Sequence, residues 1–240
     1  MAQLRLRTVL LLLFLPAVAN ILTSYAISAH AAVQAIAEGA PPREIALRAV
    51  RAAYTYSFYW SILQVCFGLY AAKLMGGSRW LREQYVLSDL TARPLSAAAA
   101  ITWLVLLSEG LIWAEQLAMA QLYGGWEGYM AFWREVVKGV PLWSKLYFVC
   151  VAPLTAGVFE EVIWRGFGVT QLEGHTNTQR AVLLQAAAFG VWHGLSPHAL
   201  VAFLIGLAYG YAYAKRRRLL ALSVAHVATD VVGFYFAFTA

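Results

Sequence analysis

Three polar clusters in an otherwise apolar sequence could do chemistry together. The first is Glu160-Glu161, followed four residues after the second carboxylate by Arg165. The second ends at His193, and the third places His226 four residues before Asp230. A charged side chain at bilayer depth costs about 2.5 to 3.5 kcal/mol, so such groups indicate a functional site. Carboxylates and imidazoles take up protons and donate to developing negative charge.

The spacing of these clusters predicts that they meet. We take residues 174–178 as a turn between two helices. Glu160 lies before the centre of this turn and His193 lies after it by nearly the same number of residues, so the two side chains reach the same depth. Two further turns bring Asp230 to the same depth, with His226 one helical turn away. Residues four apart share a helix face, so Glu161 lies with Arg165 and His226 lies with Asp230, whereas Glu160 faces another direction.

The composition predicts helices that span a membrane. Of the 240 residues, 61% are hydrophobic and 12% are charged, and the mean hydropathy is +0.63. Soluble domains have about 25% charged residues. The fold class we predict is all-α, a polytopic integral membrane bundle of about seven to eight transmembrane helices. The apolar segments lie near 8–36, 52–75, 96–122, 143–172, 180–195, 197–214 and 219–238.

The positive charge of the chain is interpreted as a topology signal. The net charge is +6, but the basic residues lie in loops between apolar segments, which favours a lipid bilayer as partner and no nucleic acid. The run from Lys215 to Arg218 and the amino-terminal arginines are expected inside, and the carboxyl terminus outside. Cys66 and Cys150 lie in apolar runs and are expected to be buried free thiols.

Residues 1–140 are predicted to form amino-terminal transmembrane helices without a recognisable signature. The apolar character of 8–36 favours an uncleaved first helix over a secretory signal peptide. Residues 126–139 mix aromatic and charged side chains, which favours a helix lying in the membrane interface. Glu109 and Glu115 lie on different faces of the third segment and are expected to be satisfied by neighbours, with a substrate or proton role as the alternative.

The remaining histidines are interpreted first as hydrogen-bonded structural residues. They are His30, His175 and His198. Of these, His198 is close enough to the predicted site to contribute to it.

In this order, the three motifs resemble those of the CAAX-protease and bacteriocin-processing family of intramembrane endopeptidases, which includes Rce1-like proteins. The pattern is Glu-Glu-x-x-x-Arg, then Phe-x-x-x-His from Phe189 to His193, then His-x-x-x-Asn/Asp, where this chain has Asp230. The resemblance covers 141–240, the expected catalytic core helices, which would form one integral unit with residues 1–140.

The resemblance implies a role for each matching residue. Glu160 would activate a water as the base, and His193 would help to hold that water. His226 and Asp230 would hold or polarise the scissile carbonyl and stabilise the oxyanion. Glu161 and Arg165 would form a structural ion pair, supported by Phe189. The substrate would be a membrane-anchored protein or peptide, such as a prenylated carboxyl-terminal motif, a leader peptide or a membrane-anchored tail.

The cofactor stays open at this stage. The family has been described both as metal-dependent and as glutamate-dependent without a metal. Zinc could be held by Glu160, His193, His226 and Asp230, with one open position. The His-Glu-x-x-His helix of zinc proteases is absent, which favours the metal-free interpretation.

Two other functions remain as alternatives to an endopeptidase. One is a non-catalytic scaffold or immunity protein of the same fold, and the other is a small proton-coupled transporter, for which no inverted repeat is visible. The expected location is the plasma (inner) membrane of a prokaryote. Neither a serine nor an aspartyl protease is supported, because Ser196 lacks a spaced base and the chain has only two aspartates.

Overall fold

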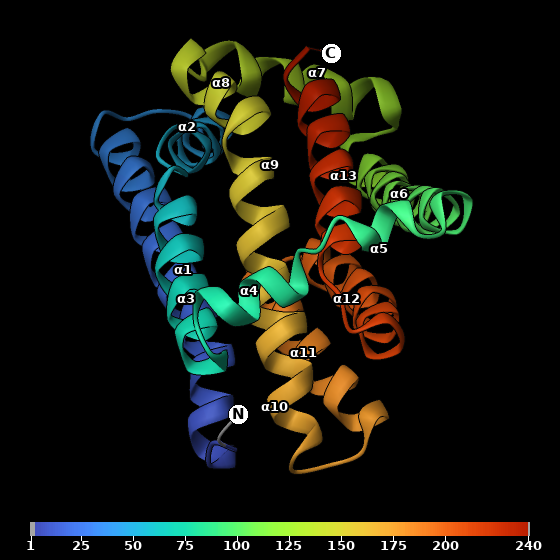
Figure 1. Ribbon diagram of the computed structural model, residues 1–240. Helices are drawn as coiled ribbons and strands as arrows, with labels where there is room; N and C mark the ends of the chain where they lie inside the picture. The colour runs from blue at the N-terminus through green and yellow to red at the C-terminus, as the bar shows by residue number, and fades with distance from the viewer. Residues whose placement is uncertain (1–2, 240) are drawn as a thin grey trace.

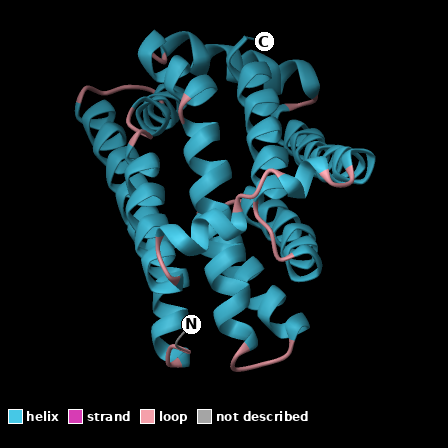
Figure 2. Ribbon diagram, in the orientation of Figure 1, coloured by secondary structure: helices cyan, strands magenta, loops and turns pink. Residues whose placement is uncertain are grey.

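The computed structural model describes residues 3–239, and those residues form helices and connecting turns without a strand (Figures 1 and 2). The helices are α1 (Leu6–Ala37), α2 (Pro42–Thr55), α3 (Tyr59–Met75), α4 (Ser78–Gln84), α5 (Ser88–Thr91), α6 (Pro94–Ala120), η1 (Gln121–Tyr123), α7 (Trp126–Gly139), α8 (Leu142–Cys150), α9 (Ala152–Thr155), η2 (Ala156–Val169), α10 (Thr170–Glu173), α11 (Thr178–Trp192), α12 (Pro197–Arg216) and α13 (Leu220–Thr239).

Several of these helices are long and apolar enough to cross a bilayer, and the chain is a multi-pass membrane protein. Within the described residues five spans qualify, or six if the pair α2 and α3, bent by 42°, counts as one. The expected number of seven to eight is not confirmed. The segment 180–195 forms α11, which has only 15 residues, whereas a span needs about 20.

The run from α8 to α10 forms the central column of the bundle (Figure 1). Its middle part, η2, is a π-helix in which twelve of the fourteen residues are buried, among them both glutamates and Arg165. Such widened helical turns are rare and occur mainly at functional sites. The helices α1, α3, α11, α12 and α13 all contact η2.

Glycines allow the neighbouring helices to approach η2 closely. A Cβ atom on Gly68 of α3 would lie 2.6 Å from Cδ1 and 2.8 Å from Cβ of Phe159. A Cβ atom on Gly157 would lie 2.5 Å from Cγ2 of Val227 in α13. Small residues at helix contacts are the usual means of tight packing in membranes. These two glycines therefore set how far the α3 and α13 side chains lie from the central column.

Replacing Gly68 with Ala is expected to destabilise the protein, because the added methyl group overlaps Phe159. Overpacking of this kind costs about 1 to 3 kcal/mol. The matched control is Gly110→Ala in α6, where no heavy atom lies within 4 Å of the added Cβ. That change should leave stability the same or raise it slightly. Thermal unfolding in detergent checks both, and equal melting temperatures for the two variants would contradict the packing argument.

The amino-terminal residues and the basic run both contact the turn after α10. The amino-terminal end contacts the turn after α10, where Nε2 of His175 donates to the carbonyl oxygen of Leu4 over 2.7 Å. Arg217, from the basic run, pairs with Glu173 at the same turn over 2.5 Å. The carboxyl terminus lies at the opposite end (Figure 1). Thus the amino terminus and the basic run share one end, as the charge pattern predicts.

The helix expected at 126–139 is present as α7, which crosses the end of the bundle that carries the carboxyl terminus (Figure 1). The prediction of buried thiols was wrong, because Cys66 and Cys150 are both exposed and free. They lie on outward faces of α3 and α8. In a helix that faces lipid, apolar neighbours in the sequence do not indicate burial, because the outer face is apolar as well.

Candidate active site

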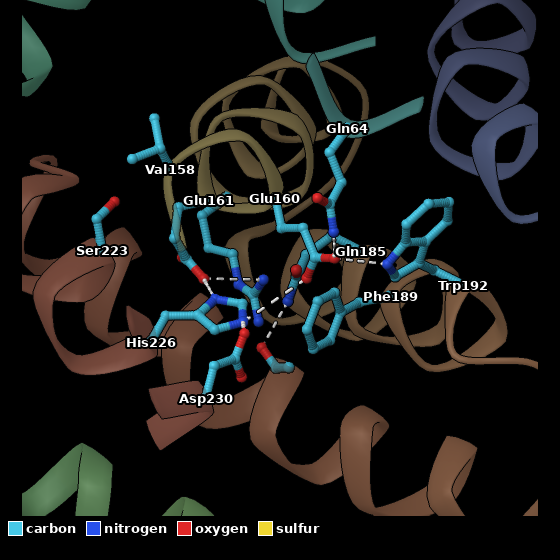
Figure 3. Close-up of polar contacts among 12 residues, drawn as sticks. Gln64, Val158, Glu160, Glu161, Gln185, Phe189, Trp192, Ser223, His226 and Asp230 are labelled. Atoms are coloured by element: carbon cyan, nitrogen blue, oxygen red, sulfur yellow. Dashed lines mark hydrogen bonds and ion pairs between the residues drawn. The ribbon is translucent and has the colours of Figure 1, made fainter. Parts of the chain in front are cut away.

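Glu160 is held in the bundle by two side-chain donors. Its Oε1 accepts from Nε2 of Gln64 over 2.8 Å and from Nε1 of Trp192 over 2.6 Å. The residue is only 2% exposed. Its other oxygen, Oε2, has no hydrogen-bond partner within the described residues and lies 3.7 Å from Nε2 of His226 (Figure 3). One oxygen is therefore fixed and the other is available for chemistry.

His226 lies among three carboxyl groups. Its Nδ1 bonds to Oε1 of Glu161 over 2.8 Å, and since a carboxylate can only accept, Nδ1 carries the proton. Its Nε2 lies between Oε2 of Glu160 at 3.7 Å and Oδ2 of Asp230 at 3.8 Å (Figure 3). A carboxylate bonded to one ring nitrogen fixes the orientation of the imidazole. Glu161 thus aims Nε2 into the site.

The ion pair expected between Glu161 and Arg165 is present and fully buried. Oε1 of Glu161 lies 3.2 Å from a guanidinium nitrogen of Arg165. The guanidinium group lies over the ring of Phe189, 4.0 Å from its centroid, and 5.3 Å from that of Tyr209. A cation over an aromatic face is attracted to it. Phe189 therefore supports the pair as the sequence predicted, and the contact of Glu161 with His226 adds a function that the sequence did not reveal.

His193 faces the same region from the end of α11. Its Nδ1 donates to the carbonyl oxygen of Phe189 over 2.9 Å, so Nε2 is the ring nitrogen left for another partner. His193 lines a cavity of about 50 Å³ together with His198, His226 and Asp230. The structure thus brings all four predicted catalytic residues to one region, with His193 reaching the site across this cavity rather than bonding to Glu160 directly.

Sequence reasoning missed the residues that anchor Glu160. Gln64 comes from α3, and Trp192 is held in turn by Nδ2 of Asn20, which donates to its carbonyl oxygen over 2.6 Å. The hydroxyl of Tyr59 donates to Oδ1 of Asn20 over 2.8 Å. Asn20 and Gln64 are polar residues inside apolar segments, and both are buried. That was the available signal, since polar groups at such depth are costly without a partner.

The side chains do not fit a metal centre in this arrangement. Within residues 3–239, no group of three or more His, Cys, Asp or Glu side chains is placed to hold a metal ion. The ring of His226 is bound through Nδ1 to Glu161, and the contacts of its Nε2 with carboxylates exceed 3.5 Å. The four zinc candidates named from the sequence therefore lie near one another without forming a ligand set.

The other polar residues of the spans have different positions. Nδ1 of His198 donates to Oε2 of Glu115 over 2.7 Å, so Glu115 is satisfied by a neighbour as expected. Glu109 has one buried oxygen without a hydrogen-bond partner in the described part of the chain. His30 is exposed on α1, and His175 serves the amino-terminal end.

Comparison with known proteins gives one result for the segment that carries the motifs. Residues 141–232 match the family model described as type II CAAX prenyl endopeptidase Rce1-like. No curated protein and no solved structure matches the chain. The matched segment contains η2, the end of α11 and most of α13, the elements that supply both glutamates, both site histidines and Asp230. Residues 141–232 of this multi-pass membrane protein are therefore similar to the Rce1-like family of CAAX-type proteases.

Proposed function

We propose that this protein is a glutamate-dependent intramembrane endopeptidase, which hydrolyses a peptide bond in a membrane-anchored protein or peptide. The observation that carries the proposal is the state of Glu160, buried and anchored through Oε1 while Oε2 faces His226. A general base needs a fixed position and one free oxygen within reach of a water.

Each site residue has one step in the reaction. Oε2 of Glu160 takes a proton from a water, whose position His193 helps to fix by accepting its second hydrogen at Nε2. The water oxygen attacks the scissile carbonyl carbon. Nε2–H of His226 donates to the developing oxyanion, and Asp230 is a second donor when protonated. Donors fixed in advance in a site of low dielectric stabilise such charge strongly.

We further propose a division of labour along the chain. The helices within 141–240 supply the reacting groups and one anchoring donor, Trp192, while those within 1–140 supply the other donor, Gln64, close the bundle and contribute the interfacial helix α7. The proposed location is the plasma (inner) membrane of a prokaryote. The substrate classes are prenylated carboxyl-terminal motifs, leader peptides and membrane-anchored tails.

The test is cleavage by the purified protein in proteoliposomes. The probes are a farnesylated CAAX peptide and an unprenylated peptide with one transmembrane segment. Mass spectrometry should find defined products, and in water enriched in oxygen-18 the new carboxyl terminus should carry the label. Binding of a probe without cleavage would favour the scaffold alternative. Proton-coupled flux without cleavage would favour the transporter.

Replacing Trp192 with Phe is expected to slow cleavage, because Oε1 of Glu160 then loses one of its two donors. A hydrogen bond to a charged group contributes about 1.5 to 3 kcal/mol, which corresponds to a loss of roughly 10- to 100-fold in kcat. Trp103→Phe is the control, since Trp103 is 61% exposed on α6. Initial rates of cleavage are measured for both variants. An equal loss of rate in the Trp192 and Trp103 variants would contradict the anchoring role of Trp192.

A further inference from the structure

A second carboxylate–imidazole pair lies beside the proposed site, on helices that the first pair does not use. His198 is in the first turn of α12, and Glu115 is on α6. Nδ1 of His198 lies 2.7 Å from Oε2 of Glu115. This repeats the relation of His226 to Glu161, where Nδ1 also bonds to a glutamate over 2.8 Å. Both imidazoles are therefore held through Nδ1, with Nε2 directed elsewhere.

The two imidazoles share one cavity. His198 lines it together with His193, His226 and Asp230, and the ring centroids of His198 and His193 are 5.6 Å apart. On α6, Ser108 and Ile112 line the same cavity, and residues spaced by three or four positions, as these two and Glu115 are, share one helix face. His198 is thus part of the cavity wall, and Glu115 lies on the same face of α6 as two residues that line it.

The exposure of the two proton-transfer groups differs. The side chain of His198 is 41% exposed and that of Glu115 is 15% exposed, whereas Glu160 is 2% exposed behind Gln64 and Trp192. Glu160 is placed to act on a water deep in the site. His198 lines the cavity with a side chain that is partly exposed, so a leaving group in the cavity can reach its ring.

We propose that His198 is the general acid that protonates the leaving amine, and that Glu115 is the residue that positions it. The proposal rests on the proposed endopeptidase function. The groups that face His198 are Glu115 from α6, His193 from α11 and Asp230 from α13. Of these, Glu115 is the one hydrogen-bonded to the His198 ring, and through Nδ1 it orients the imidazole and leaves Nε2 for another partner.

The step balances in protons and electrons. When the tetrahedral intermediate collapses, its oxyanion re-forms the carbonyl and the C–N bond breaks, with the electron pair passing to nitrogen. Nε2 of His198 gives its proton to that nitrogen, which leaves as a neutral amine. The proton that Glu160 took from the water then returns to His198 through solvent. The net reaction consumes one water and yields one acid and one amine.

The alternative is that the pair only ties α6 to α12. Loss of a purely structural contact between α6 and α12 would lower the cleavage rates of all substrates alike, because it acts through the fold. A general acid affects only leaving groups that need a proton. An amide nitrogen must be protonated to leave, whereas a thiolate leaves without a proton. The scissile bond of the substrate therefore distinguishes the two explanations.

The experiment uses the full chain in proteoliposomes with two forms of the probe peptide that the wild-type protein cleaves, one with the scissile amide and one with a thioester in its place. His198→Gln should lower kcat for the amide at least about 100-fold, within the range of general acid catalysis, and for the thioester less than about fivefold. Glu115→Gln should give a smaller loss, again confined to the amide. The control is His30→Gln, exposed on α1, which should change neither rate.

Each outcome decides a separate point. Equal losses of kcat on the amide and the thioester would overturn the role of His198 while leaving the endopeptidase function in place. An unchanged kcat on the amide would also overturn it and would assign the acid step to Glu160. Thioester turnover by the His198 variant reports that its fold is intact. Failure of the wild-type protein to cleave either the farnesylated CAAX peptide or the unprenylated transmembrane peptide would reject the proposed function and, with it, this step.

Discussion

Glu160→Gln is expected to abolish peptide cleavage, with a loss of at least about 10³-fold in kcat for the probe that the wild-type protein cleaves, within the range of a lost general base. The amide oxygen of the new side chain can still accept from Gln64 and Trp192, so the anchoring bonds are kept. At the position of Oε2 the amide presents N–H groups, which cannot take a proton from water. Product formation over time, measured in proteoliposomes, gives the rate.

The control for this change is Glu127→Gln, at an exposed carboxylate on α7. It should cleave at the wild-type rate, and both variants should have the melting temperature of the wild-type protein. If the Glu160→Gln protein kept more than about a tenth of the activity, the base would lie elsewhere and the assignment of Glu160 would fail.

Arg165→Met is expected to be the most destabilising single change in the site. It leaves the fully buried Glu161 without its cationic partner on the same helix. Breaking a buried ion pair by removing one partner costs about 3 to 5 kcal/mol, since the remaining charge stays out of water. The ring of Phe189 also loses the cation over its face. Thermal unfolding in detergent should show a large drop in melting temperature.

The matched comparison is Arg79→Met, because Arg79 also pairs at four residues' spacing, with Glu83, but both side chains are more than half exposed. Exposed pairs of this kind contribute about 0.3 to 0.5 kcal/mol. The double variant Glu161→Gln with Arg165→Met should recover part of the stability, since no uncompensated charge remains, but not activity, since His226 loses its carboxylate partner. Equal effects of the Arg165 and Arg79 changes would show that the buried charge is compensated by other groups.

The residues of the candidate site could be predicted from the sequence more completely than the number of membrane spans around them. Helical spacing brings Glu160, His193 and Asp230 to one depth, with His226 one turn away, because every residue adds the same rise and turns reverse the direction. That reasoning did not reveal which oxygen of Glu160 is free, because the answer depends on Gln64 from α3 and on Trp192. It also missed the contact between Glu161 and His226, since two residues on different helices have no sequence spacing that marks them.

The number of spans was harder to predict for a related reason. Apolar content predicts a helix in the membrane region but not whether that helix crosses it. The helix α11 is apolar because it packs against α12 and η2, and at 15 residues it is short for a span. Likewise, α2 and α3 were predicted in part as one segment, yet they are separated by a bend of 42°.

The anchoring of Glu160 has a consequence for how members of such a family diverge. Its donor from α3, and the Asn20 support behind Trp192, come from a part of the chain outside the segment that matches the family. Two enzymes could therefore keep identical motifs and still differ in the strength of their base, through exchanges at positions that motif comparison never inspects. Transplanting the first 75 residues between such enzymes would transfer reactivity along with the scaffold.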